Sequence, residues 1–193
     1  MTAPGGRRLA SDTVLLVVDV QEGFADPVWG RRNNPEAEAN VARLLESWRR
    51  TRRPVVFIQH DSLDEESPLH PDAPGHAIQA AVCPREDEPV MHKRVNSSFI
   101  GTGLEQWLRE RGYDSLVVVG LTTPHCVSTT VRMAANLGFE TFIVSDATAA
   151  FELRGPDGRM VPPEVVHSVE LAALNEEFAT VVESAELLES VGS

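Results

Sequence analysis

Residues 14–21 read VLLVVDVQ, and this stretch decides the fold class of the chain. Its first five residues are all apolar and mostly β-branched, which is typical of a strand buried on both faces of a parallel sheet. Shorter apolar runs follow at residues 55–58, 116–119, 142–144 and 179–182. The chain is therefore expected to place several buried strands in one sheet.

Amphipathic helix patterns separate these strand-like runs. In the first, over residues 36–51, four apolar side chains at i, i+3, i+4 and i+7 fall on one helical face. Alternating strands and helices predict an α/β fold with a parallel sheet between helix layers. Residues 61–89 and 146–161 interrupt the alternation and read as long loops. Further helices are predicted around residues 104–108, over 125–137, from 162 onward and over 184–190.

The composition narrows the class of protein. The chain has 193 residues, 42% of them apolar and 24% charged, and no linker divides it. We predict one domain over residues 12–190 after an N-terminal tail of residues 1–11. The net charge of −12 would repel phosphate backbones, and the apolar runs are too short to span a bilayer, so neither nucleic-acid nor membrane partners are expected. The N-terminus lacks a signal pattern and the two cysteines form no CxxC, which favours the cytoplasm.

Reactive side chains follow the predicted strands. In an open α/β sheet, sites form beyond the carboxyl ends of the strands. Asp19 follows the first strand, Lys93 follows a short apolar segment, and Cys126 lies at the start of the helix predicted over residues 125–137. A helix N-terminus and a nearby ammonium would both stabilise a thiolate. A lone cysteine there is more often a small buried residue, but the convergence of three reactive groups favours a functional site.

Lys93 is the only lysine among 17 basic residues, the other 16 being arginine. A compact ammonium on a flexible stem can do what a planar guanidinium cannot. Chance retention of one lysine is the alternative interpretation. Its position next to the other two candidates favours a catalytic role.

No cofactor is predicted. The chain has neither a GxGxxG after the first strand nor a GxxxxGK[ST] motif, so nucleotide binding is unsupported. A group of histidines and aspartates around residues 60–76 matches no tight metal-ligand spacing, and the prediction is that no metal is bound. His92, His125 and His167 are expected to pack or to form hydrogen bonds, and His125 is the one that could tune the thiol. The residues weighed as metal ligands are His60, His70, His76, Asp61, Asp64 and Asp72.

Four segments together carry a resemblance to a known family. They are VVDVQEGF (17–24), HKRVNSSFIGTGLEQWLR (92–109), VVGLTTPHCVSTTVRMAANLGF (118–139) and VSDATAAF (144–151). Over about residues 12 to 190 the chain resembles the isochorismatase-like cysteine hydrolase superfamily. That superfamily includes nicotinamidases, N-carbamoylsarcosine amidase, ureidoacrylate amidohydrolases and streptothricin hydrolase. The resemblance implies a three-layer α/β/α, Rossmann-like fold with a six-stranded parallel sheet.

The resemblance also implies a mechanism and its residues. The family's catalytic triad falls on Asp19, Lys93 and Cys126. A non-proline cis peptide would join Leu121 to Thr122, and the N–H groups of Thr122 and Cys126 would form the oxyanion hole. The implied activity is hydrolysis of a small-molecule amide, carbamoyl or ureido C–N bond through a thioester on Cys126. The family also implies a homo-oligomer, either a dimer or a tetramer.

Two departures from particular family members bear on the substrate. Isochorismatase proper lacks the nucleophilic cysteine that this chain has, which disfavours ether hydrolysis. Nicotinamidases carry an Asp/His metal cluster after the second strand, and residues 57–70 lack a clean Asp-x-His pair.

The walls of a substrate pocket are assigned to residues that follow the strands. Phe24, Trp29 and Phe151 are the aromatic candidates, with core packing as the alternative, and Gln21 and His125 complete the set. Two other functions stay open: a thiol redox or sensor protein, and a catalytically silent binding or assembly protein. A redox role would normally use a second, resolving cysteine.

Overall fold

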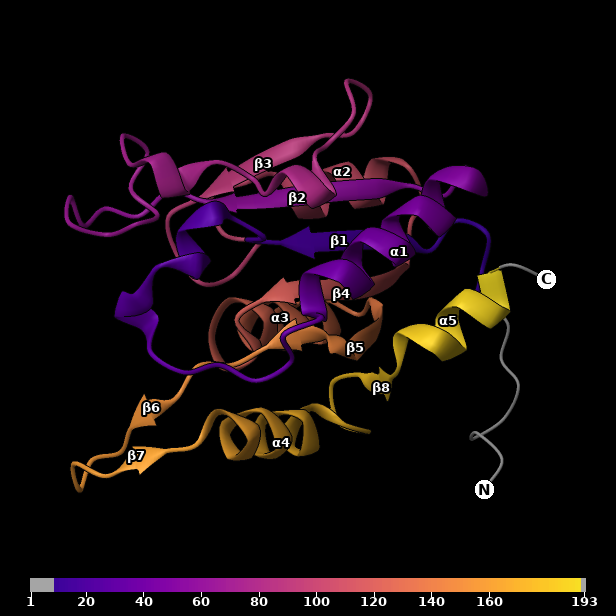
Figure 1. Cartoon of the computed structure of the whole chain (residues 1–193). Coiled ribbons are helices and arrows are strands. Elements are labelled where there is room, and N and C mark those ends of the chain that lie inside the picture. Colours follow the sequence, from indigo (N-terminus) through magenta and orange to yellow (C-terminus); the bar gives the residue numbers. More distant parts are fainter. Residues whose placement is uncertain (1–8, 192–193) are drawn as a thin grey trace.

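The computed structural model describes residues 9–191. Residues 1–8 of the predicted N-terminal tail lie outside this range, and Leu9 packs in the core with an exposed fraction of 7%. A six-stranded parallel sheet forms the centre of the molecule, in the order β3-β2-β1-β4-β5-β8 (Figure 1). The strands are β1 (Val14–Val18), β2 (Val55–His60), β3 (Val90–Lys93), β4 (Ser115–Leu121), β5 (Glu140–Ala149) and β8 (Thr180–Val182).

Helices cover both faces of this sheet, because side chains alternate along each buried strand. Leu15 and Val17 of β1 belong to a core with residues of α1 and α5, whereas Leu16 belongs to a core with residues of α2, α3 and α4. The three-layer α/β/α fold predicted from the sequence is therefore confirmed. The helices are α1 (Ala37–Arg50), α2 (Leu104–Glu110), α3 (Ser128–Asn136), α4 (Pro163–Leu174) and α5 (Ser184–Val191).

The expected apolar stripe of α1 is buried against the sheet. Val41, Leu44, Leu45 and Trp48 are each no more than 1% exposed. The indole Nε1 of Trp48 also donates a hydrogen bond to the carbonyl of Thr13, at 3.0 Å. Burial of these side chains on one stripe explains why this segment is helical and why it lies where it does.

Helix α4 differs from α1, because it leaves much of its apolar surface exposed. It buries Pro163, His167 and Leu174, whereas Val165 and Val169 are 47% and 62% exposed. None of the helices within residues 9–191 is long and apolar enough to cross a membrane.

The two predicted loops contain more structure than the sequence suggested. Strand β5 continues to Ala149, beyond the expected end at residue 144, because its second half pairs with β4 after a register shift between Val118 and Gly120. The chain then forms a hairpin of β6 (Leu153–Arg154) and β7 (Met160–Val161). In the other loop, two 3₁₀ turns (Pro74–His76 and Ala80–Val82) anchor the chain, and Val82 is fully buried.

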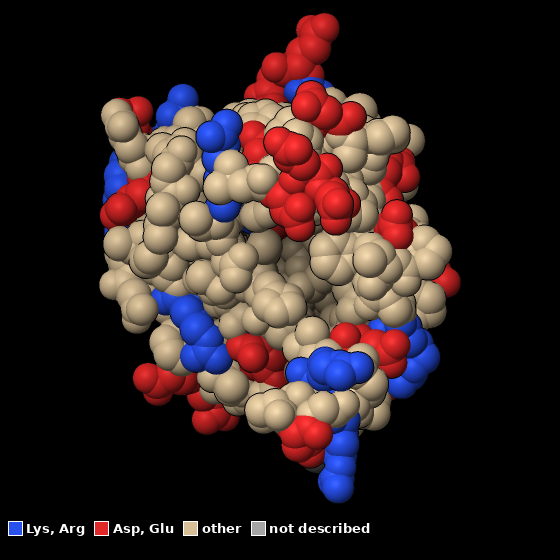
Figure 2. Space-filling view, turned by 90° about the vertical axis from the view of Figure 1, so that its left-hand side faces the viewer, with Lys and Arg blue, Asp and Glu red and all other residues tan. Residues whose placement is uncertain are grey.

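The carboxyl ends of the parallel strands share one edge of the sheet. Seen from that side, the surface is hollowed near its centre (Figure 2). Two short 3₁₀ turns, Glu22–Ala25 and Pro27–Trp29, follow β1 at this edge, and a π-helical turn, Thr123–Val127, follows β4.

Candidate active site

Asp19, Lys93 and Cys126 meet at the carboxyl edge of the sheet, as the sequence predicted. The Nζ atom of Lys93 lies 2.6 Å from Oδ2 of Asp19 and 3.2 Å from Sγ of Cys126. Strand β2 separates β3 from β1, so Lys93 must reach past one strand, and neighbouring strands lie about 4.8 Å apart. The long, flexible lysine stem bridges that distance, and the side chains of Lys93 and Asp19 are both fully buried.

His60 is the third partner of the Lys93 ammonium. Its Nδ1 atom lies 3.1 Å from Nζ. Burial and the charge of Lys93 lower the pKa of His60, so a neutral imidazole presents its lone pair to the lysine. The three protons of the ammonium therefore meet three acceptors on three different residues. We call Asp19, Lys93, His60 and Cys126 the inner cluster.

One carboxylate oxygen of Asp19 has a hydrogen-bond partner, and the other has none among the described residues. Oδ2 accepts from Lys93, whereas Oδ1 is buried and has no hydrogen-bond partner among the described residues. Burial raises the pKa of this carboxyl, and Lys93 opposes the shift. A buried carboxylate oxygen without a partner costs free energy, and such groups persist where chemistry uses them. Asp19 also has a positive φ of 51°, a region that aspartate enters more readily than most residues.

The state of the thiol differs from the sequence-based expectation. Burial, followed by the negative charge of Asp19, raises the pKa of Cys126, and the opposing effect of Lys93 is smaller. The net shift is therefore opposite to the thiolate that the sequence suggested for this position. Cys126 lies in the π-helical turn before α3 and is 9% exposed, so desolvation dominates. A neutral thiol needs a base before it can attack.

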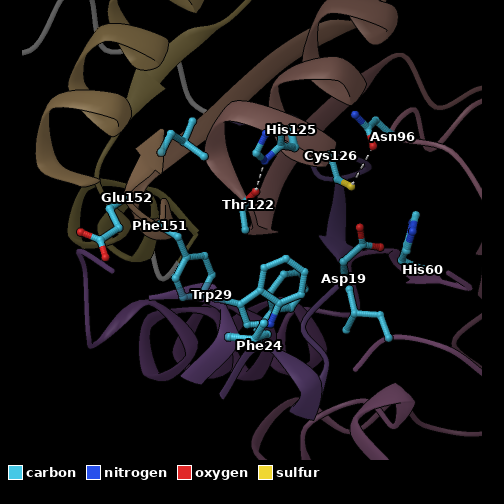
Figure 3. Close-up of a pocket in the computed structure, with 13 residues that line it drawn as sticks. Asp19, Phe24, Trp29, His60, Asn96, Thr122, His125, Cys126, Phe151 and Glu152 are labelled. Carbon is cyan, nitrogen blue, oxygen red and sulfur yellow. Dashed lines mark hydrogen bonds between the residues drawn. The ribbon is translucent and has the colours of Figure 1, made fainter. Parts of the chain in front are cut away.

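The turn that carries Cys126 begins with the predicted cis peptide bond between Leu121 and Thr122. Thr122 Oγ1 lies 3.0 Å from Nδ1 of His125, and the His125 N–H donates to the Thr122 carbonyl (Figure 3). Burial lowers the pKa of His125. His125 therefore holds Thr122 in position through these two contacts. No hydrogen bond among the described residues joins His125 to the Cys126 thiol, which the sequence suggested it could tune. The oxyanion role of the Thr122 and Cys126 N–H groups stays a prediction.

Gly120 allows this turn to lie close to the first strand. Its φ is +116°, and a Cβ atom at this position would collide with the backbone of Val18. Only glycine fits here, which explains how the ends of β1 and β4 bring Asp19 and Cys126 together.

A cavity of about 290 Å³ lies over the inner cluster (Figure 3). Phe24, Trp29, Phe151 and His125 line it, as predicted. The three aromatic rings form one continuous wall, with centroids 5.3 to 6.2 Å apart. The full lining consists of Asp19, Phe24, Val28, Trp29, His60, Leu69, Asn96, Thr122, His125, Cys126, Phe151, Glu152 and Leu153.

Gln21 does not line the cavity, contrary to the sequence-based assignment. Its side chain is fully buried, and its Nε2 donates to the carbonyls of His60 and His76. Its Oε1 accepts from the His60 N–H at 2.9 Å. The amide therefore ties β2 and the following loop to the end of β1.

Several lining residues were missed by sequence reasoning. Asn96 has its Oδ1 3.9 Å from Sγ of Cys126, and its position three residues after Lys93 was the available signal. Val28, Leu69, Glu152 and Leu153 lie in the segments that follow the strands of the main sheet, and no pattern in the sequence marks them as neighbours of the triad.

A second polar cluster lies beside the first. Oδ1 of Asp61 accepts from Nε2 of His76 at 2.8 Å and from Nδ1 of His92 at 3.0 Å. We call Asp61, His76 and His92 the outer cluster. Asp61 and His76 are among the residues weighed as metal ligands from the sequence, whereas His92 was expected to pack or to form hydrogen bonds, so the cluster as a whole was not predicted. His70, Asp64 and Asp72 do not join it.

The outer cluster contains the donor set of a metal site. Its three ligand atoms lie within 4.8 Å of one another, and two imidazoles with one carboxylate suit a divalent transition metal. The same atoms already form hydrogen bonds with one another, so the cluster is satisfied without an ion. No step of the chemistry below uses a metal.

Comparisons with known proteins agree with this geometry. The model of the isochorismatase domain matches residues 13–186. The uncharacterized isochorismatase family protein YrdC of Bacillus subtilis is 47% identical over 174 residues, covering 90% of this chain and 93% of the relative. Streptothricin hydrolase of Streptomyces noursei is 34% identical over 142 residues, covering 72% of this chain and 50% of the relative.

An isochorismatase-family structure from Chromobacterium violaceum superimposes with a TM-score of 0.94 and 41% identity, covering 98% of this chain and 99% of the other. The family model, at residues 13–186, spans nearly the whole described fold and includes both Asp19 and Cys126. This chain therefore belongs to the isochorismatase family of hydrolases.

Proposed function

We propose that the protein hydrolyses a small-molecule C–N bond, in an amide, carbamoyl or ureido group, through a thioester on Cys126. The observation that carries this proposal is the free Oδ1 of Asp19 in a buried cluster with the Cys126 sulfur and the Lys93 Nζ. A base with an open oxygen beside a nucleophile, at the floor of a cavity, is the arrangement that acyl transfer requires.

The first half of the reaction forms the thioester. Asp19 accepts the thiol proton, and the sulfur attacks the substrate carbonyl. Lys93 holds the carboxyl group and the sulfur in place through its bonds to Oδ2 and Sγ, and its charge stabilises whichever of the two is anionic. The N–H groups of Thr122 and Cys126 hold the oxyanion, and each such donor is worth about 3–4 kcal/mol. The protonated Asp19 then gives its proton to the departing nitrogen, and ammonia or an amine leaves.

The second half releases the acid. Asp19 is again ionised and takes a proton from a water molecule, whose oxygen attacks the thioester carbonyl. The intermediate collapses, the carboxylic acid leaves, and the thiol recovers its proton from Asp19. One amide bond and one water are consumed, and one acid and one amine are formed.

The test is a panel of amides assayed for amine or acid product by mass spectrometry. The panel contains nicotinamide, an N-carbamoyl amino acid, a ureido acid and a streptothricin-type lactam. We expect turnover on one class, an acyl adduct on Cys126, and no turnover by Cys126→Ala. Cys83→Ala is the matched control, because Cys83 is exposed and outside the cavity. Activity of Cys126→Ala above a few per cent of the wild type would refute the covalent mechanism.

The alternative functions predict other outcomes of the same panel. A redox protein would be silent on all amides and would form a Cys83–Cys126 disulfide with peroxide. A silent binding protein would also leave Cys126 unlabelled by an amide-shaped electrophile. No contact in the described residues joins the two thiols, so we favour the hydrolase.

We propose in addition that the protein assembles as a homo-oligomer and works in the cytoplasm. The exposed Val165 and Val169 of α4 offer an apolar surface for self-association, and a reducing compartment would keep Cys126 a thiol. Light scattering on the purified protein tests the assembly, and a monomeric mass would exclude it.

A further inference from the structure

The cavity over Cys126 lacks a positively charged wall. None of its 13 lining residues is Lys or Arg. Lys93, the basic group closest to the reaction, has its charge balanced by Asp19 at 2.6 Å. His60 lines the cavity with its Nδ1 atom 3.1 Å from the Lys93 ammonium, and His125 lines it with a pKa that burial lowers. Within residues 9–191, a substrate carboxylate would therefore find no free counter-ion in the cavity lining.

One further acidic residue, Glu152, belongs to the lining at the far end of the cavity. Figure 3 shows Glu152 at the opposite end of the lining from Asp19 and His60. The arginines near it have other partners: Arg31 pairs with Glu164 at 2.6 Å, and Arg32 pairs with Glu38 at 2.7 Å. Glu152 Oε1 accepts only a long bond, 3.3 Å, from the backbone N–H of Arg31. Its negative charge is thus not neutralised by any ion pair among the described residues.

Side chains of both signs surround the mouth, and the acidic ones form the largest group at its edge (Figure 2). The segment over residues 61–72 supplies Leu69 to the cavity wall and holds five acidic residues but no Lys or Arg. Acidic side chains gather beside the hollow in Figure 2. The whole chain has a net charge of −12. Charges of one sign around a cleft attract ligands of the opposite sign and repel those of the same sign.

The aromatic wall adds a preference of its own. Trp29 is half-buried at the cavity, and the face of an indole ring attracts cations. The wall of Phe24, Trp29 and Phe151 also suits a flat or apolar group without any charge. An anionic group gains nothing from these rings.

We propose that the substrate is an amide without a negative charge, and that a positively charged group next to the reacting amide is favoured through Glu152. This inference rests on the proposed hydrolase function and narrows it. It selects neutral and cationic amides over N-carbamoyl amino acids and ureido acids, which carry carboxylates. Glu152 is a specificity-determining residue in this account and takes no part in the bond-making steps.

The test uses Cys126 itself as the reporter, so that no substrate needs to be known. Two methanethiosulfonate reagents of equal length are compared, one ending in trimethylammonium and the other in sulfonate. Each transfers its side chain to the thiol as a disulfide and releases methanesulfinate. The protein carries Cys83→Ser, and each rate is divided by the rate with free 2-mercaptoethanol. We expect the corrected rate of the cationic reagent to exceed that of the anionic one by about tenfold at low salt, and 0.5 M NaCl to reduce the ratio.

Two variants locate the effect. Glu152→Gln keeps the side-chain shape and should lower the cation-to-anion ratio about threefold. Asp157→Asn removes an acid from the same 151–161 segment, at a position outside the cavity, and should leave the ratio unchanged. A ratio of one or below would overturn the proposal, and so would equal effects of the two variants. Failure of both reagents to modify Cys126 would also count against it, because it requires an accessible cavity.

The amide panel separates this inference from the proposed function. Charge-selective modification of Cys126 without turnover of any amide would contradict the proposed hydrolase function. It would still support the proposed charge preference of the cavity. Turnover of an N-carbamoyl or ureido acid in preference to a neutral amide would confirm the hydrolase and overturn the charge preference.

Discussion

The inner and outer clusters lie side by side at the same edge of the sheet, and adjacent residues, His60 and Asp61, belong to one each. Both are built around an aspartate with nitrogen donors. In the inner cluster the carboxylate and the ammonium are fully buried, and one carboxylate oxygen has no partner. In the outer cluster the side chain of Asp61 is 16% exposed and that of His92 is 52% exposed, and one oxygen accepts two N–H groups.

The difference separates a reactive arrangement from a satisfied one. A buried oxygen without a partner is destabilising by about 1–3 kcal/mol, and a proton brought by the thiol relieves that cost. In the outer cluster, the Asp61 carboxylate already accepts hydrogen bonds from two imidazole N–H groups, and the cluster is partly exposed to solvent. We therefore assign the chemistry to the inner cluster and a supporting role to the outer one, and four changes test that division.

The largest effect is expected from Asp19→Asn, compared with Asp61→Asn. The amide at position 19 cannot accept the thiol proton, so kcat/KM should fall by about 10³-fold or more. The same substitution at position 61 should leave kcat/KM within a few fold of the wild type. Steady-state kinetics on the substrate found in the panel, with thermal unfolding to check the fold, make the measurement. Equal losses in the two variants would abolish the distinction between the clusters.

Lys93→Arg should have the next largest effect. The planar guanidinium keeps the charge, but it cannot direct single protons to Asp19, His60 and Cys126 as the ammonium does. Misplacement of the catalytic groups by about 1 Å costs roughly 100-fold in rate. The measured quantity is kcat/KM at a temperature well below the unfolding temperature of the variant, so that the enzyme is fully folded during the assay. Full activity would mean that the single lysine is a compositional accident.

The pH dependence of kcat/KM should show both titrating groups of the inner cluster. Burial raises the pKa of Asp19 above 3.8, and Asp19 must be ionised to act as a base. Burial and Lys93 hold the pKa of His60 below 6.5, and a protonated His60 could not accept from Lys93. Activity should thus fall as the pH falls, with a limiting slope of log(kcat/KM) approaching two.

The His60→Gln variant is the control for that profile. Its amide oxygen can still accept from Lys93 but does not titrate in this range. The acid limb should therefore approach a slope of one. A limb identical to that of the wild type would show that the protonation of His60 has no part in the loss of activity.

The smallest effect concerns the outer cluster and appears in stability. Partial burial opposes it, but the bonds from His92 and His76 hold the pKa of Asp61 below its usual value. A lowered pKa in the folded state stabilises the protein above the unfolded pKa, and this contribution is lost as the pH falls through the folded pKa. Asp61→Asn should cost about 1 kcal/mol at pH 7. Urea unfolding should show that difference closing below pH 3.8, and a constant difference at all pH values would contradict this account.

The sequence predicted the parts of the site that regular structure positions. Parallel strands end at one edge, so reactive residues at the ends of β1, β3 and β4 had to converge there. The six-stranded sheet, and the cis bond after Leu121, were implied by the family resemblance.

The remaining features depend on loops and on burial, which the sequence does not encode locally. The convergence of His76 and His92 on Asp61 requires the path of a long loop. Gln21 looked like a pocket residue because of its place after β1, but its amide serves the backbone of that loop. The raised pKa of Cys126 depends on how deeply the turn is buried, and a motif carries no information on depth.

The three bonds of Lys93 also have a practical consequence for handling this protein. It is the only lysine in the chain and its side chain is fully buried, so the folded protein offers no lysine amine to succinimidyl esters. Conventional lysine conjugation or biotinylation would therefore not proceed through a lysine of the folded protein. Modification of Lys93 requires the sheet edge to open, so the rate at which Lys93 is labelled, followed by mass spectrometry, reports on that opening.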